Sequence, residues 1–344
     1  KLLMNSKKTF IIAETGVNHN GDMKMAKELI HEAKKAGVSA IKFQTFIANK
    51  SISKFAPKAK YQIESTSIDE SQLEMCKSLE LSDSEHYEIF EECKKNKIEF
   101  ISTPFDKESI ELLLQLKVKK IKVASSELNN YPFLIDIAKT KKDIILSTGM
   151  GTLKEIKDAL KLFKIHGLKK DRITIMHCNT AYPTPFKDAN LNAILTIKNS
   201  LKVKVGYSDH TLGIEAPIAA VAIGADIIEK HFTLDRNLPG PDHKSSIEPT
   251  ELKKMVKSIR NIEIAMGSGI KKPSNSEKKI IKISRKSIVA NKKIKKYEIF
   301  TKKNLAIKRP GNGISPTHFN KILGLKSDRD YVEDQIIKIR NIKL

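Results

Sequence analysis

Cysteine is scarce in this sequence. The three cysteines, Cys76, Cys93 and Cys178, form no CxxC pair and no even-numbered set of the kind a disulfide framework needs. Disulfides are typical of secreted proteins, whereas free thiols persist in the reducing cytoplasm. We therefore expect reduced cysteines and a cytoplasmic protein.

Long apolar runs are missing as well. No run in the 344 residues approaches the roughly 20 apolar residues that a helix needs to cross a bilayer. The first residues carry positive charge, but the apolar run Phe10–Ala13 is too short for the core of a signal peptide. We therefore expect no transmembrane helix and no membrane partner.

Acidic residues are outnumbered by basic ones, 40 against 63, which gives a formal net charge of +23. Such a charge suits nucleic acid or an anionic substrate. The lysines are spread along the chain in pairs such as Lys34–Lys35, Lys94–Lys95 and Lys169–Lys170, without interleaved aromatic residues. A solvated lysine-rich surface explains this pattern, so we expect no nucleic-acid partner. A nucleic-acid binder, recognised by a steep salt dependence, is the alternative.

Eight short runs of β-prone residues alternate with segments that have apolar residues at helical spacing, such as Met25–Ala36 and Leu153–Lys164. The eight runs are Thr9–Ala13, Ala40–Gln44, Glu99–Ser102, Ile121–Val123, Asp143–Leu146, Ile173–His177, Lys204–Gly206 and Ile227–Lys230. Eight such units predict an α/β fold of the TIM (β/α)8 barrel type. A doubly wound sheet is the alternative, but Glu14–Asp22, which follows the first run, contains no GxGxxG motif.

The pattern changes near the C-terminus. Residues 1–269 are predicted to form the barrel domain, and residues 270–284 a polar linker. Residues 285–344 hold short extended runs separated by turns, which predict a small β-rich domain. A domain of this size is near the lower limit of independent stability, so we expect it to pack against the barrel or another subunit.

Two histidines stand at the ends of neighbouring predicted strands. His210 and His231 flank one βαβ crossover, and parallel strands bring their C-terminal ends side by side. Asp209, Asp242 and His243 add polar groups at the same end. Converging imidazoles with open positions suit a catalytic divalent metal, although a structural role is the ordinary one for a single histidine.

Two lysines stand at other strand ends. In the second run Lys42 and Gln44 share one face, and a lysine inside a barrel is costly to bury unless an anion neutralises it. Lys122 and several hydroxyl residues occupy comparable positions. Together they favour a site for a multiply charged small anion, such as a phosphate that bears a carboxylate. Lysines that extend to solvent along the rim are the alternative.

Ten segments in order resemble the bacterial sialic acid synthase family. They are AETGVNHNGD, IKFQTF, STPFD, KVASSELNNYP, STGMGT, HCNTAYPTPF, GYSDHT, EKHFTLD, GPDHKSSIEP and KRPGNGISP, and the resemblance runs from about residue 8 to 335. The resemblance implies condensation of phosphoenolpyruvate with N-acetylmannosamine to give N-acetylneuraminate and phosphate. It also implies a divalent metal, Mn²⁺ or else Mg²⁺ or Co²⁺, an antifreeze-like (SAF) C-terminal domain, and a domain-swapped homodimer.

The same resemblance implies roles for individual residues. Metal ligands are His210 and His231, and acidic groups at the reacting centre are Glu14 and Glu127. Phosphoenolpyruvate contacts are Lys42, Thr103, Lys122, Ser125, Ser147 and Ser208, and Thr180 stands where some relatives carry asparagine beside the phosphate. Sugar contacts are Gln44, Tyr182 and Asp242, with Arg309 reaching the N-acetyl group from the partner subunit.

Two alternatives share most of these residues. The motifs for phosphoenolpyruvate and metal do not separate N-acetylmannosamine from a 2,4-diacetamido-2,4,6-trideoxyhexose, whose product is legionaminic or pseudaminic acid. The segments HCNTAYPTPF and APKAKYQIE favour N-acetylmannosamine. A non-catalytic anion or carbohydrate binder on the same barrel is the second alternative, and it would bind without releasing phosphate.

Overall fold

The structure is a computed structural model that describes residues 8–66 and 69–339. The segment examined for a signal peptide begins at residues 1–7, and the predicted small domain ends at residues 340–344; both stretches lie outside the described residues. The chain divides into two compact units, Lys1–Ser268 and Gly269–Leu344. No helix among the described residues is long and apolar enough to cross a membrane.

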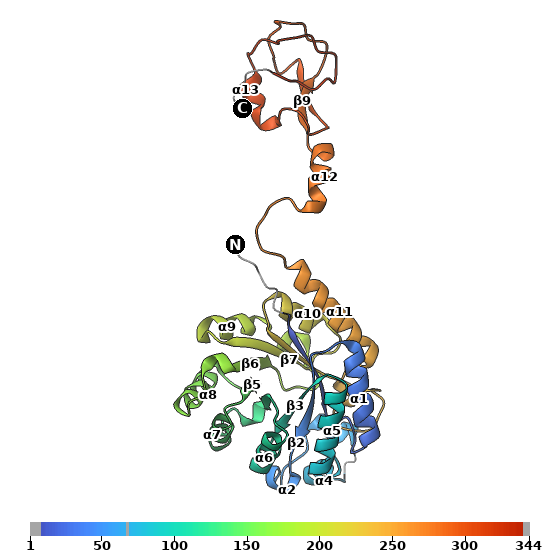
Figure 1. The fold of residues 1–344 in the computed structure, drawn as a ribbon, viewed down its shortest axis with the longest axis vertical. Helices are drawn as coiled ribbons and strands as arrows, with labels where there is room; N and C mark the ends of the chain where they lie inside the picture. The colour runs from blue at the N-terminus through green and yellow to red at the C-terminus, as the bar shows by residue number, and fades with distance from the viewer. Residues whose placement is uncertain (1–7, 67–68, 340–344) are drawn as a thin grey trace. The chain divides into compact units, whose positions relative to one another are not determined.

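The first unit is built on a sheet of eight parallel strands (Figure 1). They are β1 Phe10–Gly16, β2 Ala40–Thr45, β3 Glu99–Pro104, β4 Lys120–Val123, β5 Asp143–Ser147, β6 Ile173–Cys178, β7 Lys204–Asp209 and β8 Ile227–His231. Their order is β3-β2-β1-β8-β7-β6-β5-β4, and β3 also lies against β4. The predicted TIM-like barrel is therefore confirmed.

Helices on the outside of the strands bury their apolar faces against the sheet (Figure 1). They are α1 Met23–Ala36, α5 Asp83–Lys95, α6 Lys107–Gln115, α7 Tyr131–Lys139, α8 Leu153–Ile165, α9 Asn192–Leu201, α10 Glu215–Ala222 and α11 Pro249–Ala265. Three short helices, α2 Ala48–Ser51, α3 Lys60–Ser65 and α4 Gln72–Ser78, lie in the connection between β2 and α5. Side-chain caps begin several of the helices; Asp22, for example, accepts from the Lys24 N–H at the start of α1.

Inside the barrel an apolar layer lies below a polar one. Six buried residues form a cluster of their own: Ile12, Ala40, Ile101, Ile145, Met176 and Ile227. Each is followed two positions later on its strand by a residue that lines the cavity described below, namely Glu14, Lys42, Thr103, Ser147, Cys178 and Glu229. Because successive side chains on a strand alternate between faces, both layers face the same way. The apolar layer supports the polar layer at the C-terminal strand ends.

The strands continue further than the sequence predicted at these ends. β1 extends to Gly16 and β7 to Asp209, three residues past the predicted ends. The prediction stopped at the first polar residues, because polar side chains are costly to bury alone. The structure places several of these side chains in contact with one another, so the strands continue into a polar layer.

The second unit is small and mainly irregular. It contains α12 Asn275–Ser284, the antiparallel pair β9 Ser287–Ala290 and β10 Leu305–Lys308, and α13 Phe319–Ile322. Its core includes Ile288, Phe300 and Tyr331. The segment expected to be a linker, 270–284, contains helix α12, which begins with a reciprocal capping box between Ser274 and Glu277.

Candidate active site

A cavity of about 540 Å³ opens at the C-terminal ends of the barrel strands. All fourteen predicted site residues of the barrel line it: Glu14, Lys42, Gln44, Thr103, Lys122, Ser125, Glu127, Ser147, Thr180, Tyr182, Ser208, His210, His231 and Asp242. They come from all eight strands or from the loops behind them. Function in TIM barrels lies at this face, because loops from every strand meet there. Arg309 belongs to the second unit, where it is exposed.

Buried charges meet on the floor of this cavity. The Lys42 Nζ lies 2.9 Å from the Glu14 Oε2 and 3.5 Å from the Glu229 Oε1, and it donates to the Thr103 Oγ1 at 3.1 Å. The Lys122 Nζ lies 3.3 Å from the same Glu229 oxygen. Both lysine side chains are about 95% buried, so neither extends to solvent along the rim.

Glu229 is a site residue that the sequence analysis did not name. Its Oε1 bridges the two ammonium groups and also accepts from Ser208 at 3.0 Å. The signal was present in the sequence, because Glu229 precedes His231 by two positions and therefore shares its face of β8. An acidic residue next to a lysine was a weak signal, since most such residues form surface ion pairs.

The two floor carboxylates differ in protonation. Burial favours the neutral form of both, but the ammonium groups of Lys122 and Lys42 outweigh it at Glu229 and hold that pKa low. At Glu14, burial and the nearby Glu229 charge raise the pKa despite Lys42. Burial lowers the pKa of Lys122. The floor thus holds the two lysine ammonium groups and the ionised Glu229 between them. Glu14, with its raised pKa, is the carboxyl of this group that takes up a proton most easily.

Small polar groups line the cavity beside Lys122. The Gly149 N–H donates to the Ser125 Oγ at 2.9 Å, and the Ser147 Oγ is buried without a hydrogen-bond partner among the described residues. A Cβ at Gly149 would lie 2.5 Å from the Thr180 Cγ2 and 3.0 Å from the Ser125 Oγ. Only glycine allows this close approach. These groups form a cradle for the oxygens of an anion.

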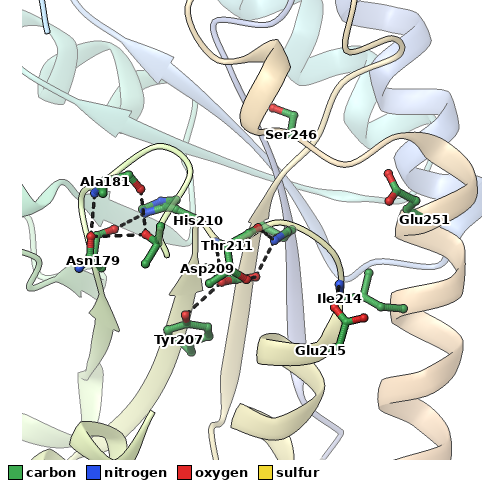
Figure 2. Close-up of polar contacts among 12 residues, drawn as sticks. Asn179, Ala181, Tyr207, Asp209, His210, Thr211, Ile214, Glu215, Ser246 and Glu251 are labelled. Carbon is green, nitrogen blue, oxygen red and sulfur yellow. Dashed lines mark hydrogen bonds and ion pairs between the residues drawn. The ribbon is translucent and has the colours of Figure 1, made fainter. Parts of the chain in front are cut away.

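The two histidines lie together at the ends of β7 and β8. Their ring centroids are 5.3 Å apart. Figure 2 shows His210 turned toward Asn179, whose carbonyl oxygen accepts a hydrogen bond from the His210 Nδ1. This bond leaves the His210 Nε2 with a lone pair. Burial lowers the pKa of His210 to about 4 and the pKa of His231 well below its ordinary value, so both imidazoles are neutral at pH 7.

The donor set fits a catalytic metal. The His231 Nδ1 is buried without a hydrogen-bond partner among the described residues, and it lies 3.9 Å from the Asp242 Oδ2. No group of three or more His, Cys, Asp or Glu side chains in the described ranges is arranged to hold a metal ion. Catalytic metals keep positions open for water and substrate, whereas structural zinc takes four protein ligands. His210 and His231 could supply two ligands and leave the other positions open.

Aromatic and acidic residues border the histidines. The Tyr182 ring centroid lies 4.2 Å from that of His210 and 5.6 Å from that of His231. Burial raises the pKa of Asp242 to about 6. Gly16 has a φ of +51°, and a Cβ added to it would lie within 3.4 Å of side-chain atoms of Glu14, Asp242 and Gln44. These groups can hold a polyhydroxylated substrate next to the imidazoles.

Glu127 reaches the cavity from the short 3-10 turn Ser125–Glu127 that follows β4. The Asn130 Nδ2 donates to its Oε2 at 2.6 Å, and the Ser126 hydroxyl donates to its Oε1 at 3.2 Å. A carboxylate held from both oxygens has a defined orientation. The site can therefore bind an anion at one end, a neutral polar molecule at the other, and a metal between carboxylates and imidazoles.

Comparisons with known proteins agree with this geometry. The model of the NeuB family matches residues 29–271, and the model of the SAF domain matches residues 285–342. The N,N'-diacetyllegionaminic acid synthase of Campylobacter jejuni is 53% identical over 332 residues, which is 96% of this chain and 99% of that protein. The enzyme of the same name from Legionella pneumophila is 45% identical, over 92% of this chain and 89% of that protein.

Among solved structures, the N-acetylneuraminic acid synthetase of Leptospira borgpetersenii in complex with citrate matches with a TM-score of 0.69. It is 36% identical and covers 80% of this chain and 91% of that chain. The predicted SAF domain is confirmed by the family match. These relatives thus include a synthase of N-acetylneuraminic acid and synthases of N,N'-diacetyllegionaminic acid, one of the alternative products that the sequence left open.

Proposed function

This chain belongs to the NeuB family, and from that premise we propose that it condenses phosphoenolpyruvate with an open-chain N-acetylated amino sugar and water, which yields a nonulosonic acid and phosphate. The observation that carries the proposal is the buried pair Lys42 and Lys122 beside two neutral imidazoles in one cavity. Two buried cations suit a substrate with both a carboxylate and a phosphate. The imidazoles suit a metal next to an aldehyde.

The lysines orient phosphoenolpyruvate in this proposal. Lys42 and Lys122 neutralise its anionic groups, and Glu229 keeps both ammonium groups in place before the substrate arrives. Ser125, Ser147 and the Gly149 backbone surround the phosphate. Holding the two reactants in one orientation converts a bimolecular step into an effectively unimolecular one.

His210 and His231 hold a divalent metal, for which we propose Mn²⁺. When bound, this metal supplies Lewis-acid polarisation of an aldehyde carbonyl. Asn179 fixes the tautomer of His210 through its Nδ1, and Tyr182 stacks beside that ring, so the ligand orientation does not depend on the metal. Asp242, with its raised pKa, lies on the sugar side and can hold a sugar hydroxyl.

Glu14 handles the proton of the water. C3 of phosphoenolpyruvate forms the new bond to the aldehyde carbon, and water adds to C2; phosphate then leaves by C–O cleavage. Glu14 lies opposite His231 on the neighbouring strand, and burial raises its pKa to about 8, so its carboxylate form is a stronger base toward this water than an ordinary glutamate. Glu127, held by Asn130 and Ser126, is the second acidic group of the site.

The assembly is a further part of the proposal. We propose a homodimer in which Arg309 of one subunit completes the sugar site of the other, since the small unit carries this arginine exposed. We also propose a cytoplasmic location, which agrees with the three free cysteines.

The test is release of inorganic phosphate. Purified protein is incubated with phosphoenolpyruvate, Mn²⁺ and either N-acetylmannosamine or 2,4-diacetamido-2,4,6-trideoxymannose, and phosphate and the keto-acid product are measured. Sugar-dependent release is expected, and His231→Ala is expected to abolish it together with metal binding in calorimetry. Binding of phosphoenolpyruvate without release for any sugar would show a non-catalytic binder. Full activity without metal would overturn the role of the histidines.

A further inference from the structure

One wall of the cavity is apolar, in contrast to its charged floor. Val17, Met75 and Leu79 are buried and form a separate cluster, against which Phe46 and Cys76 pack. Val17 comes from the loop after β1, and the others come from the long connection between β2 and α5 or, at Phe46, directly from the end of β2. All five line the cavity. A wall of this kind offers nothing to a hydroxyl group but can bury a methyl group.

A single unpaired acceptor lies in this wall. Gln72, the first residue of α4, lines the cavity, and its Oε1 is buried without a hydrogen-bond partner among the described residues. Its Nε2 contacts the Cys76 Sγ at 3.8 Å. Buried amide oxygens are nearly always paired, because an unmade hydrogen bond there is costly. The Gln72 oxygen is therefore positioned for a donor that arrives with the ligand.

Gln62 provides a direct contrast. It also lines the cavity, but its Oε1 already accepts from the Ala59 N–H at 2.9 Å in the first turn of α3. Gln62 and Gln72 thus line the same cavity, one with an occupied oxygen and one with a free oxygen. Of these two, Gln72 has the acceptor to offer.

The apolar wall adjoins the sugar side of the site. The Tyr61 ring centroid lies 5.2 Å from that of Tyr182, which packs on His210. Gln72 and the apolar residues line the same cavity as Tyr182 and Asp242. A substrate held at Tyr182 and Asp242 therefore has room to extend a substituent toward Gln72.

We propose that Gln72, Met75 and Leu79 form a subsite for a second acetamido group on the sugar, which rests on the proposed synthase function. The amide N–H of this group donates to the Gln72 Oε1, and its methyl group packs against Met75 and Leu79. N-Acetylmannosamine has a hydroxyl at the corresponding carbon; its O–H rotates freely and can donate to water instead of Gln72, and it leaves the apolar wall unfilled. The chain accordingly prefers a 2,4-diacetamido-2,4,6-trideoxyhexose.

The experiment compares three sugars in the full-length protein. They are 2,4-diacetamido-2,4,6-trideoxymannose, 2-acetamido-2,6-dideoxymannose and N-acetylmannosamine, so that the acetamido group and the missing 6-hydroxyl are varied separately. Phosphate release gives kcat/KM for each sugar with the wild type, Gln72→Met and the matched control Gln62→Met. Thermal unfolding of the variants shows that they are folded.

The diacetamido sugar is expected to be the best substrate of the wild type. Gln72→Met is expected to lower its preference over the 2,6-dideoxy sugar about 10-fold, the order expected for one lost buried hydrogen bond. Gln62→Met is expected to leave that preference within about twofold. An equal loss for all three sugars in Gln72→Met, or an unchanged preference, overturns the subsite while the synthase function stands. Absence of phosphate release with every sugar in the wild type overturns the synthase function itself.

Discussion

Asp209 and Lys230 form a fully buried ion pair across β7 and β8, with the Lys230 Nζ 2.6 Å from the Asp209 Oδ2. The two residues are register partners, and each directly precedes one of the paired histidines, His210 and His231. The Tyr207 hydroxyl and the Thr211 N–H also bond to Asp209, each at 3.0 Å (Figure 2). The pair therefore ties the two strand ends together behind the imidazoles and sets their spacing.

Breaking this pair should cost stability and metal affinity. Lys230→Met leaves the Asp209 carboxylate buried without its counter-charge, and we expect a loss of about 3–5 kcal/mol in the free energy of unfolding, measured with denaturant. Mn²⁺ affinity in calorimetry should fall as well, because the imidazoles lose their fixed spacing. The control Arg172→Met breaks an exposed pair with Asp143 and should cost about 1 kcal/mol or less. Equal losses of unfolding free energy in the two variants would contradict the proposed role of the Asp209–Lys230 ion pair.

The buried lysine on β4 should matter for the anion. Lys122→Met removes one of two cations on the cavity floor, and we expect kcat/KM for phosphoenolpyruvate to fall about 100-fold, as for a lost hydrogen bond to a charged group. The control is Lys120→Met. Lys120 is the first residue of the same strand and pairs with Glu99, the first residue of β3, away from the cavity at the C-terminal strand ends. If both variants have the same kinetics, the cationic floor is not the anion site.

Gly149 should accept no side chain. The Cβ of Gly149→Ala would lie 2.5 Å from the Thr180 Cγ2 and 3.0 Å from the Ser125 Oγ, so the anion cradle must open. We expect KM for phosphoenolpyruvate to rise at least about 10-fold, with a loss of about 1–3 kcal/mol in stability. Adding Thr180→Ser removes the methyl group and should restore part of the affinity. No change in KM for Gly149→Ala would show that the cradle is not used.

Stability should fall in mild acid through His19. Burial and, to a smaller extent, the nearby His86 lower the pKa of His19 to about 4 although Glu85 opposes them, and the His19 Nδ1 accepts from the Gly21 N–H. A histidine with a lowered folded-state pKa binds more protons when unfolded, so its contribution is complete above about pH 6.5 and is lost as the pH falls toward 4.

His19→Gln should therefore give a shallower dependence of the unfolding free energy on pH between about 6.5 and 4. Denaturant unfolding at several pH values checks this, and parallel curves for the wild type and His19→Gln would refute the assignment.

Much of the candidate site was visible in the sequence because strands alternate. His210 directly follows β7, His231 ends β8, and Lys42 shares the inward face of β2 with the apolar Ala40 two positions earlier. Period-2 alternation and the parallel packing of neighbouring strand ends therefore predict that these side chains converge. Glu229 was missed, because its role as a bridge between two lysines depends on strands β2, β4 and β8 meeting in space.

The sequence by itself determined the order of eight βα units, the small C-terminal domain and which strand ends carry polar residues, because these follow from local periodicity. Only the tertiary structure decided which of those groups are partners. Contacts such as Glu229 with Lys42 and Lys122 join residues more than a hundred positions apart. The unpaired oxygen of Gln72 also appears only after folding, since a free acceptor is defined by everything that surrounds it.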